Sequence, residues 1–271
     1  MPSKVVRLSG RIQHILNEGP RVKRFFITVP EKLSFSAGQS VALSIPNLCD
    51  ARGPIKRMFS IVSIPEKTEL EFCIAITPPP SFSSSIAELP VGSEVIIEGP
   101  FGIFTLKESK PLLTSAFEVS KTANEFHVQP QLQALQLPSF IAAGTGIAPI
   151  MCMIRTLACE GKKGLHLLYG FRTTEDFLYK EELEKYAAAN VIFLTTSASR
   201  LENTHIKENI KPAESTTPSI AKIGRITQYL NTIKNIGQQV YICGPPEMVK
   251  DTVAELLETG FTKEQITREQ W

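Results

Sequence analysis

The stretch Phe140-Ile-Ala-Ala-Gly-Thr-Gly-Ile-Ala-Pro149 decides the fold of the second half of the chain. Its apolar start predicts a short buried strand, and Pro149 suits the first turn of a following helix. In parallel sheets, ligands bind at the carboxyl ends of strands, where glycine lets another molecule approach the backbone and helix N–H groups can hold a phosphate. A tight strand-to-helix turn without a ligand is the alternative, and the third glycine of the common dinucleotide fingerprint is absent.

A second turn of this kind lies in Val240-Tyr-Ile-Cys-Gly-Pro-Pro-Glu-Met248. Here too an apolar strand leads directly into a turn and a helix. Cys243 falls at the carboxyl end of the strand, where it would line the same crevice. A buried cysteine that packs as a small hydrophobic residue is the alternative.

The second half alternates apolar strands with amphipathic helices, as in a parallel sheet covered on both faces. We expect strands over 140–143, 165–169, 191–195, 240–243 and 265–271, and helices over 147–159, 174–189, 225–233 and 247–259.

The first half has a different rhythm. Short segments rich in β-branched and aromatic residues are separated by proline and glycine, which favours a sandwich or a small antiparallel barrel. We expect strands over 22–29, 40–45, 58–64, 70–76 and 94–97, and one short helix over 84–89.

The long segment 108–138 separates the two rhythms. A connection of this length is unusual inside a compact domain, which favours a domain boundary there. We therefore expect an N-terminal domain over 1–107, a connecting segment over 108–138 and an α/β domain over 139–271.

Composition excludes several classes of protein. The net charge of +2 gives no support for nucleic-acid binding, and no apolar run approaches the ~20 residues that span a bilayer. The N-terminus lacks the apolar core of a secretory signal. The five cysteines are scattered, without a Cys-x-x-Cys pair, so we expect no disulfide framework and no metal site. A cytoplasmic location is the natural inference.

Two further segments of the first half carry candidate binding residues. Arg57-Met-Phe-Ser60 begins an expected strand, and its arginine, ring and hydroxyl would suit a phosphate, a planar group and a ring nitrogen. Pro79-Pro-Ser-Phe-Ser-Ser-Ser85 precedes the short helix, and its serines would either cap that helix or bind a pyrophosphate. A solvated arginine and a simple helix cap are the alternatives.

Taken in order along the chain, these segments resemble the ferredoxin–NADP reductase superfamily. The resemblance covers nearly the whole chain and also includes Ala37-Gly-Gln-Ser-Val-Ala-Leu43 and Gly99-Pro-Phe-Gly102. It implies a six-stranded antiparallel barrel that binds flavin, followed by a parallel α/β domain that binds a pyridine nucleotide. No iron–sulfur domain is expected, because no cysteine cluster is present.

The resemblance also implies roles for individual residues. Arg57 would contact the flavin phosphate, Phe59 would pack beside the flavin, and Ser60 would lie near the flavin nitrogen that accepts hydride. The expected cofactor-binding residues are Arg57, Met58, Phe59, Ser60, Ser83, Ser84, Gly144, Thr145, Gly146, Ile147, Ala148, Pro149, Arg172, Ser199, Arg200, Cys243, Gly244, Pro245, Pro246, Met248 and Trp271. Ser60, Cys243 and Trp271 are expected at the catalytic centre.

The implied function is a flavoprotein reductase that passes hydride from NADPH or NADH to FAD and then electrons to an acceptor. Ferredoxin, flavodoxin, an oxygenase component and free flavin are the acceptor classes. Ser199-Arg200 resembles a pair that binds the 2′-phosphate of NADP, which favours NADPH. Pro78-Pro-Pro80 stands where the family often has glycine and supports the alternative, a non-catalytic binding or regulatory module of a larger redox complex.

Overall fold

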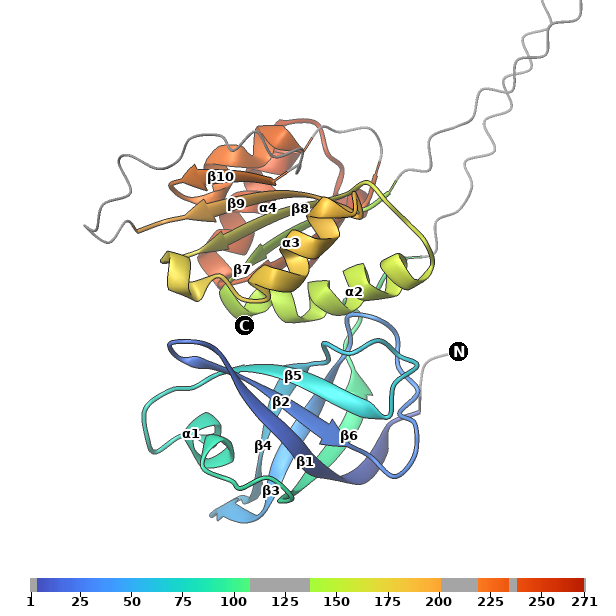
Figure 1. Ribbon diagram of the computed structural model, residues 1–271, viewed down its shortest axis with the longest axis vertical. Helices are drawn as coiled ribbons and strands as arrows, with labels where there is room; N and C mark the ends of the chain where they lie inside the picture. Colours follow the sequence, from blue (N-terminus) through green and yellow to red (C-terminus); the bar gives the residue numbers. More distant parts are fainter. Residues whose placement is uncertain (1–3, 108–136, 201–218, 234–237, 271) are drawn as a thin grey trace, which may run out of the picture.

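The protein is described by a computed structural model over residues 4–107, 137–200, 219–233 and 238–270. This part of the chain forms two six-stranded sheets, one from each half (Figure 1). Most of the expected connecting segment lies outside the described residues. The two expected fold types, antiparallel in the first half and parallel in the second, are confirmed.

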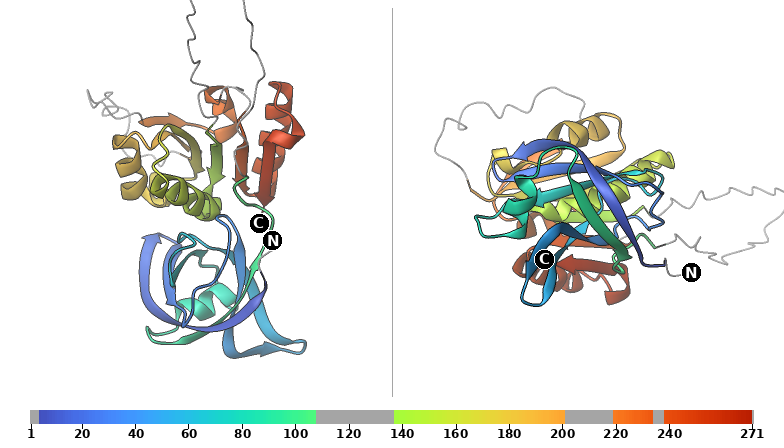
Figure 2. Two further views of the ribbon diagram at one scale, coloured as in Figure 1. Left: turned by 90° about the vertical axis from the view of Figure 1, so that its right-hand side faces the viewer. Right: turned by 90° about the horizontal axis from the view of Figure 1, so that it is seen from below.

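The first sheet is entirely antiparallel and has the strand order β4-β3-β6-β1-β2-β5. Figure 2 shows it curled into a barrel. The barrel closes just beyond β4, where Ile61 pairs with Phe72 and the amide of Val62 donates to the carbonyl of Glu71. The bounds are β1 Val6–Gly19, β2 Val22–Thr28, β3 Ser40–Asp50, β4 Gly53–Ser60, β5 Glu69–Ala75, α1 Phe82–Ala87 and β6 Glu94–Phe101.

The second sheet is parallel and has the order β10-β9-β8-β7-β11-β12. Helices α2 and α3 cover one face, and α4 with a 3₁₀ segment covers the other (Figure 1). The bounds are β7 Ser139–Ala143, α2 Ile147–Cys159, β8 Leu165–Phe171, α3 Lys180–Ala188, β9 Ile192–Ala198, β10 Ser219–Ile223, a 3₁₀ segment Ile226–Thr232, β11 Val240–Gly244, α4 Pro246–Glu258 and β12 Ile266–Gln270.

The core on the α2 side of the second sheet is continuous with the barrel core. Side chains alternate along each strand, so Phe140 and Cys243 join the barrel side, whereas Ile141 and Ile242 join the separate α4 cluster. Helix α2 therefore lies between the sheet and the barrel (Figure 1). The turns that begin α2 and end β11 consequently face the barrel domain.

Four elements of the structure differ from the expectation, two because they were not expected and two because their type or bounds differ. The long strand β1 and the edge strand β10 were not expected, although β1 alternates buried and exposed residues around Leu8 and Ile12. The expected helix 174–189 is a 3₁₀ turn followed by α3, because Tyr179 takes a positive φ of 55° between them. The expected helix 225–233 is 3₁₀.

No helix in the described part of the chain has the length and apolar character needed to cross a bilayer.

Candidate functional site

The barrel has a surface cavity of about 350 Å³ at β4 and the start of α1. Arg57 is exposed at its wall, and one of its nitrogens donates to the carbonyl of Lys56 over 2.8 Å. The Phe59 ring lies 5.9 Å from the Phe82 ring and is tilted by 30°. The lining residues are Arg57, Met58, Phe59, Ala75, Thr77, Pro80, Ser81, Phe82 and Ser83. A cation, an aromatic face and hydroxyls therefore converge on one hollow.

The serines at the start of α1 divide between two tasks. Ser81 caps the helix by accepting from the amide of Ser84 over 3.0 Å, and the Ser84 hydroxyl donates back to the carbonyl of Ser81 over 2.8 Å. Ser84 is buried by this exchange. Ser83 instead lines the cavity and accepts from the amide of Thr77 over 2.9 Å. Of the two expected pyrophosphate-binding serines, only Ser83 faces the hollow.

The turn between β7 and α2 has the backbone geometry that its glycines predict. Gly144 takes a positive φ of 53°, and its carbonyl accepts a hydrogen bond of 3.1 Å from the buried hydroxyl of Tyr169. Thr145 is half-buried, whereas Ile147, Ala148 and Pro149 are buried in the first turn of α2. Within Gly144–Pro149, only Gly144 and Thr145 are therefore partly exposed to solvent.

The two turns identified from sequence touch each other. Gly146 packs against the backbone of Cys243 and leaves no space for a Cβ atom. In the same way, a Cβ on Gly244 would collide with the Met248 side chain and approach the Ala143 Cβ to 3.2 Å. Pro246 occupies the first position of α4. The expected residues from β11 and α4 therefore form one wall with the Gly144–Gly146 turn, and this turn also contacts barrel strand β5.

Cys243 and Glu269 lie side by side at the carboxyl ends of β11 and β12, where they are paired in register. Cys243 is 1% exposed, and burial, aided by the charge of Glu269, raises the pKa of its thiol. Burial also raises the pKa of Glu269. The Oε2 atom of Glu269 is buried and has no hydrogen-bond partner among the described residues. Strand β12 runs toward the barrel (Figure 2), and Glu269 is the second-last residue of this strand, so it belongs to the end of the sheet that faces the barrel.

Two expected arginines stand at the ends of adjacent strands, just beyond β8 and β9. The amide of Arg200 donates to the carbonyl of Arg172 over 2.8 Å, and the amide of Ser199 donates to the carbonyl of Phe171 over 3.0 Å. All three predicted residues of this group, Arg172, Ser199 and Arg200, are exposed. Two cationic side chains therefore project from neighbouring positions at the carboxyl edge of the sheet.

Ser60 and Trp271 are the other two residues expected at the catalytic centre. Ser60 is half-buried at the end of β4, where it pairs with Ser40. Within the described residues, no hydrogen bond joins Ser60 to the second half. Trp271 lies outside the described residues. The sequence did not identify Thr77, Tyr169 and Glu269 as site residues. Glu269 could have been identified, because it lies on the expected final strand, two residues before Trp271.

Comparison with known proteins gives a family match over the second half. Residues 140–254 match the family described as "Oxidoreductase NAD-binding domain". The electron transfer component of toluate 1,2-dioxygenase from Pseudomonas putida is 30% identical over 224 residues, which are 81% of this chain and 53% of that protein. The reductase component of propane 2-monooxygenase from Rhodococcus jostii is 28% identical, with coverages of 88% and 55%. The chain thus spans about half the length of these curated relatives.

Solved structures share both domains. A cytochrome P450 reductase from Amycolatopsis has a TM-score of 0.75 at 20% identity, with 99% of this chain and 70% of that chain covered. A ferredoxin–NADP⁺ reductase from Neisseria gonorrhoeae, solved with FAD and NADP, has a TM-score of 0.72 at 20% identity and 99% coverage of both chains. The chain therefore has the two-domain fold of the ferredoxin–NADP reductases, and most of its second half is similar to oxidoreductase NAD-binding domains.

Proposed function

We propose that this chain is a flavoprotein reductase that takes hydride from NADPH or NADH onto FAD and delivers the electrons to a separate acceptor. The observation that carries the proposal is the barrel cavity, in which Arg57, Phe59 and Ser83 converge. An exposed guanidinium suits a phosphate, and a ring beside a hollow suits a planar heterocycle. The residues present therefore fit a flavin nucleotide.

A bound flavin supplies the hydride chemistry, in which two electrons and one proton leave the nicotinamide and NAD(P)⁺ is released. The chain's own residues bind and orient. Arg57 and Ser83 would hold the phosphate of the flavin on the barrel. Thr145 and the wall formed by Gly146 and Cys243 would hold the nicotinamide of the pyridine nucleotide. We place the flavin domain at 1–107 and the nucleotide domain at 139–271, joined by 108–138.

The reacting centre is proposed at the carboxyl ends of β7, β11 and β12. The raised pKa keeps the Cys243 thiol protonated at neutral pH, so it would not act as a nucleophile, and its buried side chain would support the wall beside the nucleotide. At the same edge, Oε2 of Glu269 has no hydrogen-bond partner among the described residues, and this carboxyl would bind a polar group of the nicotinamide. Ser60 approaches from the barrel side, and Trp271 would cover the flavin at the end of the chain.

Arg172 and Arg200 support NADPH as the preferred nucleotide. Their exposed cations project together from adjacent strand ends, a placement that suits a phosphate dianion on the adenosine ribose. NADH lacks this phosphate and would gain little from either arginine.

The acceptor is proposed to be a redox protein of the ferredoxin or oxygenase-component class. The relatives from Pseudomonas and Rhodococcus are by name an electron transfer component and a reductase component of oxygenases. All five cysteines are unpaired, which supports a reducing compartment such as the cytoplasm. No group of three or more metal-binding side chains occurs among the described residues, so we propose no metal.

The test is reconstitution with FAD or FMN followed by anaerobic titration with each nucleotide. We expect a yellow protein that retains FAD on a desalting column and is bleached by NADPH faster than by NADH. A colourless protein that retains neither flavin and reduces no dye with either nucleotide contradicts the proposal and favours a non-catalytic module.

A further inference from the structure

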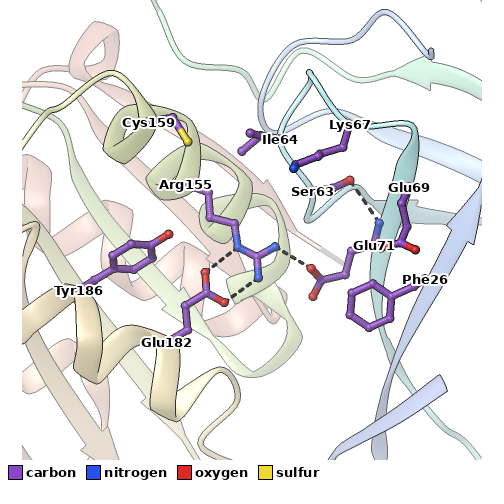
Figure 3. A pocket seen from close by; sticks show the side chains of 10 residues that line it. All are labelled: Phe26, Ser63, Ile64, Lys67, Glu69, Glu71, Arg155, Cys159, Glu182 and Tyr186. Atoms are coloured by element: carbon purple, nitrogen blue, oxygen red, sulfur yellow. Dashed lines mark hydrogen bonds and ion pairs between the residues drawn. The ribbon is translucent and has the colours of Figure 1, made fainter. Parts of the chain in front are cut away.

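Arg155 stands at the junction between the two halves of the molecule (Figure 3). It belongs to α2, and its guanidinium forms two hydrogen bonds of 2.7 Å to Glu182 of α3. The remaining nitrogen reaches into the barrel, where it lies 2.7 Å from Oε2 of Glu71 and 3.1 Å from the carbonyl oxygen of Val62. One side chain thus binds both halves at once.

Glu71 is a buried carboxylate on barrel strand β5 that Arg155 shares with a second cation. It is 4% exposed and accepts from Nε of Arg24 over 2.7 Å and from the Tyr179 hydroxyl over 2.9 Å. The Tyr179 ring lies between the arginines, 4.7 Å from the Arg24 guanidinium and 5.5 Å from that of Arg155. Charges are stable at such depth only when they are paired and hydrogen-bonded, as they are here.

The ion pairs persist across the physiological pH range. Burial alone would lower the pKa of Arg155, but the hydrogen bonds and charges of Glu182 and Glu71 raise it overall. Burial alone would raise the pKa of Glu182, but the hydrogen bond and the charge of Arg155 lower it overall. The two-pronged geometry with Glu182 fixes the plane of the guanidinium, and so fixes where its third nitrogen points.

The junction also connects the proposed flavin strand to the proposed nucleotide turn. Strand β4 ends at Ser60, and shortly beyond it the carbonyl of Val62 accepts from Arg155 and the carbonyl of Ser63 accepts from Sγ of Cys152 over 3.0 Å. Cys152 and Arg155 lie on α2, which begins directly after the Gly144–Gly146 turn. Hydrogen bonds therefore connect the segment just after β4 directly to the helix that follows the Gly144–Gly146 turn.

We propose that Arg155 is a positioning residue for hydride transfer: through Glu71 and Val62 it holds α2, and with it the Gly144–Gly146 turn, at a fixed place relative to β4. This inference rests on the proposed function. Transfer requires the reacting atoms to come within ~3–3.5 Å, and a misplacement of about 1 Å can cost ~100-fold in rate. A rigid junction between the two walls meets this requirement.

The first test compares substitutions on the same guanidinium. Arg155→Lys keeps the charge and loses the two-pronged geometry, and Glu71→Gln removes the charge across the junction. Glu98→Gln is the matched control, because it removes a carboxylate from the ion pair with Lys56 inside the barrel and leaves every contact of Arg155 in place. With FAD-loaded protein and NADPH, we expect the limiting anaerobic rate of flavin reduction to fall about 10–100-fold in the first two variants. The control should stay within about 3-fold, and the Kd for FAD should not change in any variant.

A second measurement reports the junction without turnover. Nitroxide labels on the exposed native Cys49 of the barrel and on Glu258→Cys at the end of α4, in a Cys159→Ser background, give the distance distribution between the halves. The other three cysteines are buried. We expect a narrow distribution in the parent and in Glu98→Gln, and a broad one in Arg155→Lys and Glu71→Gln.

The outcomes separate this inference from the proposed function. If the parent is reduced by NADPH but Arg155→Lys is reduced equally fast, or shows an unchanged distribution, the positioning role is overturned and the reductase function stands. If neither nucleotide reduces the FAD-loaded parent, the function and this inference fall together. Should Glu71→Gln fail to fold, Arg155→Lys decides, since it leaves a cation beside Glu71.

Discussion

Gly146 lies directly against the backbone carbonyl of Cys243, so that a Cβ atom at this position would collide with it. The contact joins the start of α2 to the end of β11. Gly146 needs no positive φ, since its φ of −61° is open to any residue. Its small size, rather than its flexibility, is what this site requires.

Gly146→Ala is therefore expected to destabilise the protein by about 1–3 kcal/mol, the usual cost of overpacking a core contact, and to raise KM for NADPH. Gly19→Ala is the comparison with a milder contact, because its Cβ would come within 3.3 Å of its nearest neighbours, against 2.3 Å at Gly146. Urea unfolding and steady-state kinetics measure both effects. A Gly146→Ala variant as stable as the parent protein would show that the turn yields without cost.

Arg57→Ala is expected to weaken FAD binding. A charge-assisted hydrogen bond to a phosphate contributes about 1.5–3 kcal/mol, which corresponds to a Kd roughly 10–100-fold higher. Lys56→Ala is the control, because the Lys56 ammonium pairs with Glu98 over 2.5 Å and does not line the cavity. Flavin fluorescence titration gives both constants. An unchanged Kd in Arg57→Ala removes this arginine from the flavin site.

Arg200→Ala is expected to raise KM for NADPH about 10-fold, since one ionic hydrogen bond to the 2′-phosphate would be lost. KM for NADH should stay the same, because NADH has no such phosphate. The ratio of kcat/KM for the two nucleotides, measured with one dye acceptor, reports the effect. A parallel loss for both nucleotides would assign Arg200 to a part that the nucleotides share, or to folding.

Glu269→Gln is expected to stabilise the protein at neutral and alkaline pH, because burial raises the pKa of this carboxyl above its usual value in the folded state. The folded chain then binds more protons at Glu269 than the unfolded chain does, so this group lowers stability as pH rises through its folded pKa. The gain in Tm should be larger at pH 8 than at pH 4. Glu258→Gln, which replaces an exposed carboxyl at the end of α4, is the control. A lower Tm for Glu269→Gln at pH 8 would mean that a partner stabilises the carboxylate.

Sequence patterns predicted the two sheets because each half has one consistent pattern: short strands separated by turn residues in the first half, and apolar strands alternating with amphipathic helices in the second. β7, β11 and α2 have apolar runs bounded by glycine or proline, and their ends fall within a residue or two of the expected ones. β1 was missed although its buried residues alternate, because charged residues and Gly10 interrupt the apolar signal. The break before α3 is tertiary in origin, since Tyr179 leaves helical geometry where its hydroxyl binds Glu71.

The sequence motifs of the candidate site could be recognised, but the contacts between these motifs could not be predicted from the sequence. The Gly144 turn and Cys243 were identified separately, and their contact follows only from the parallel register of β7 beside β11. Glu269 becomes visible as a neighbour of Cys243 once β12 is paired. The bond between Glu71 and Arg155 joins residues 84 apart in the chain, and no local pattern marks either one.

The shared carboxylate at the junction sets a condition on recombining this protein with its relatives. A chimera that takes the barrel from one reductase and the nucleotide half from another would separate Glu71 from Arg155. Arg24 would still pair with Glu71 and Glu182 with Arg155, but the ion pair that joins the two halves would be lost. Crossover points that keep Glu71 and Arg155 from the same parent should therefore give hybrids whose halves stay in register.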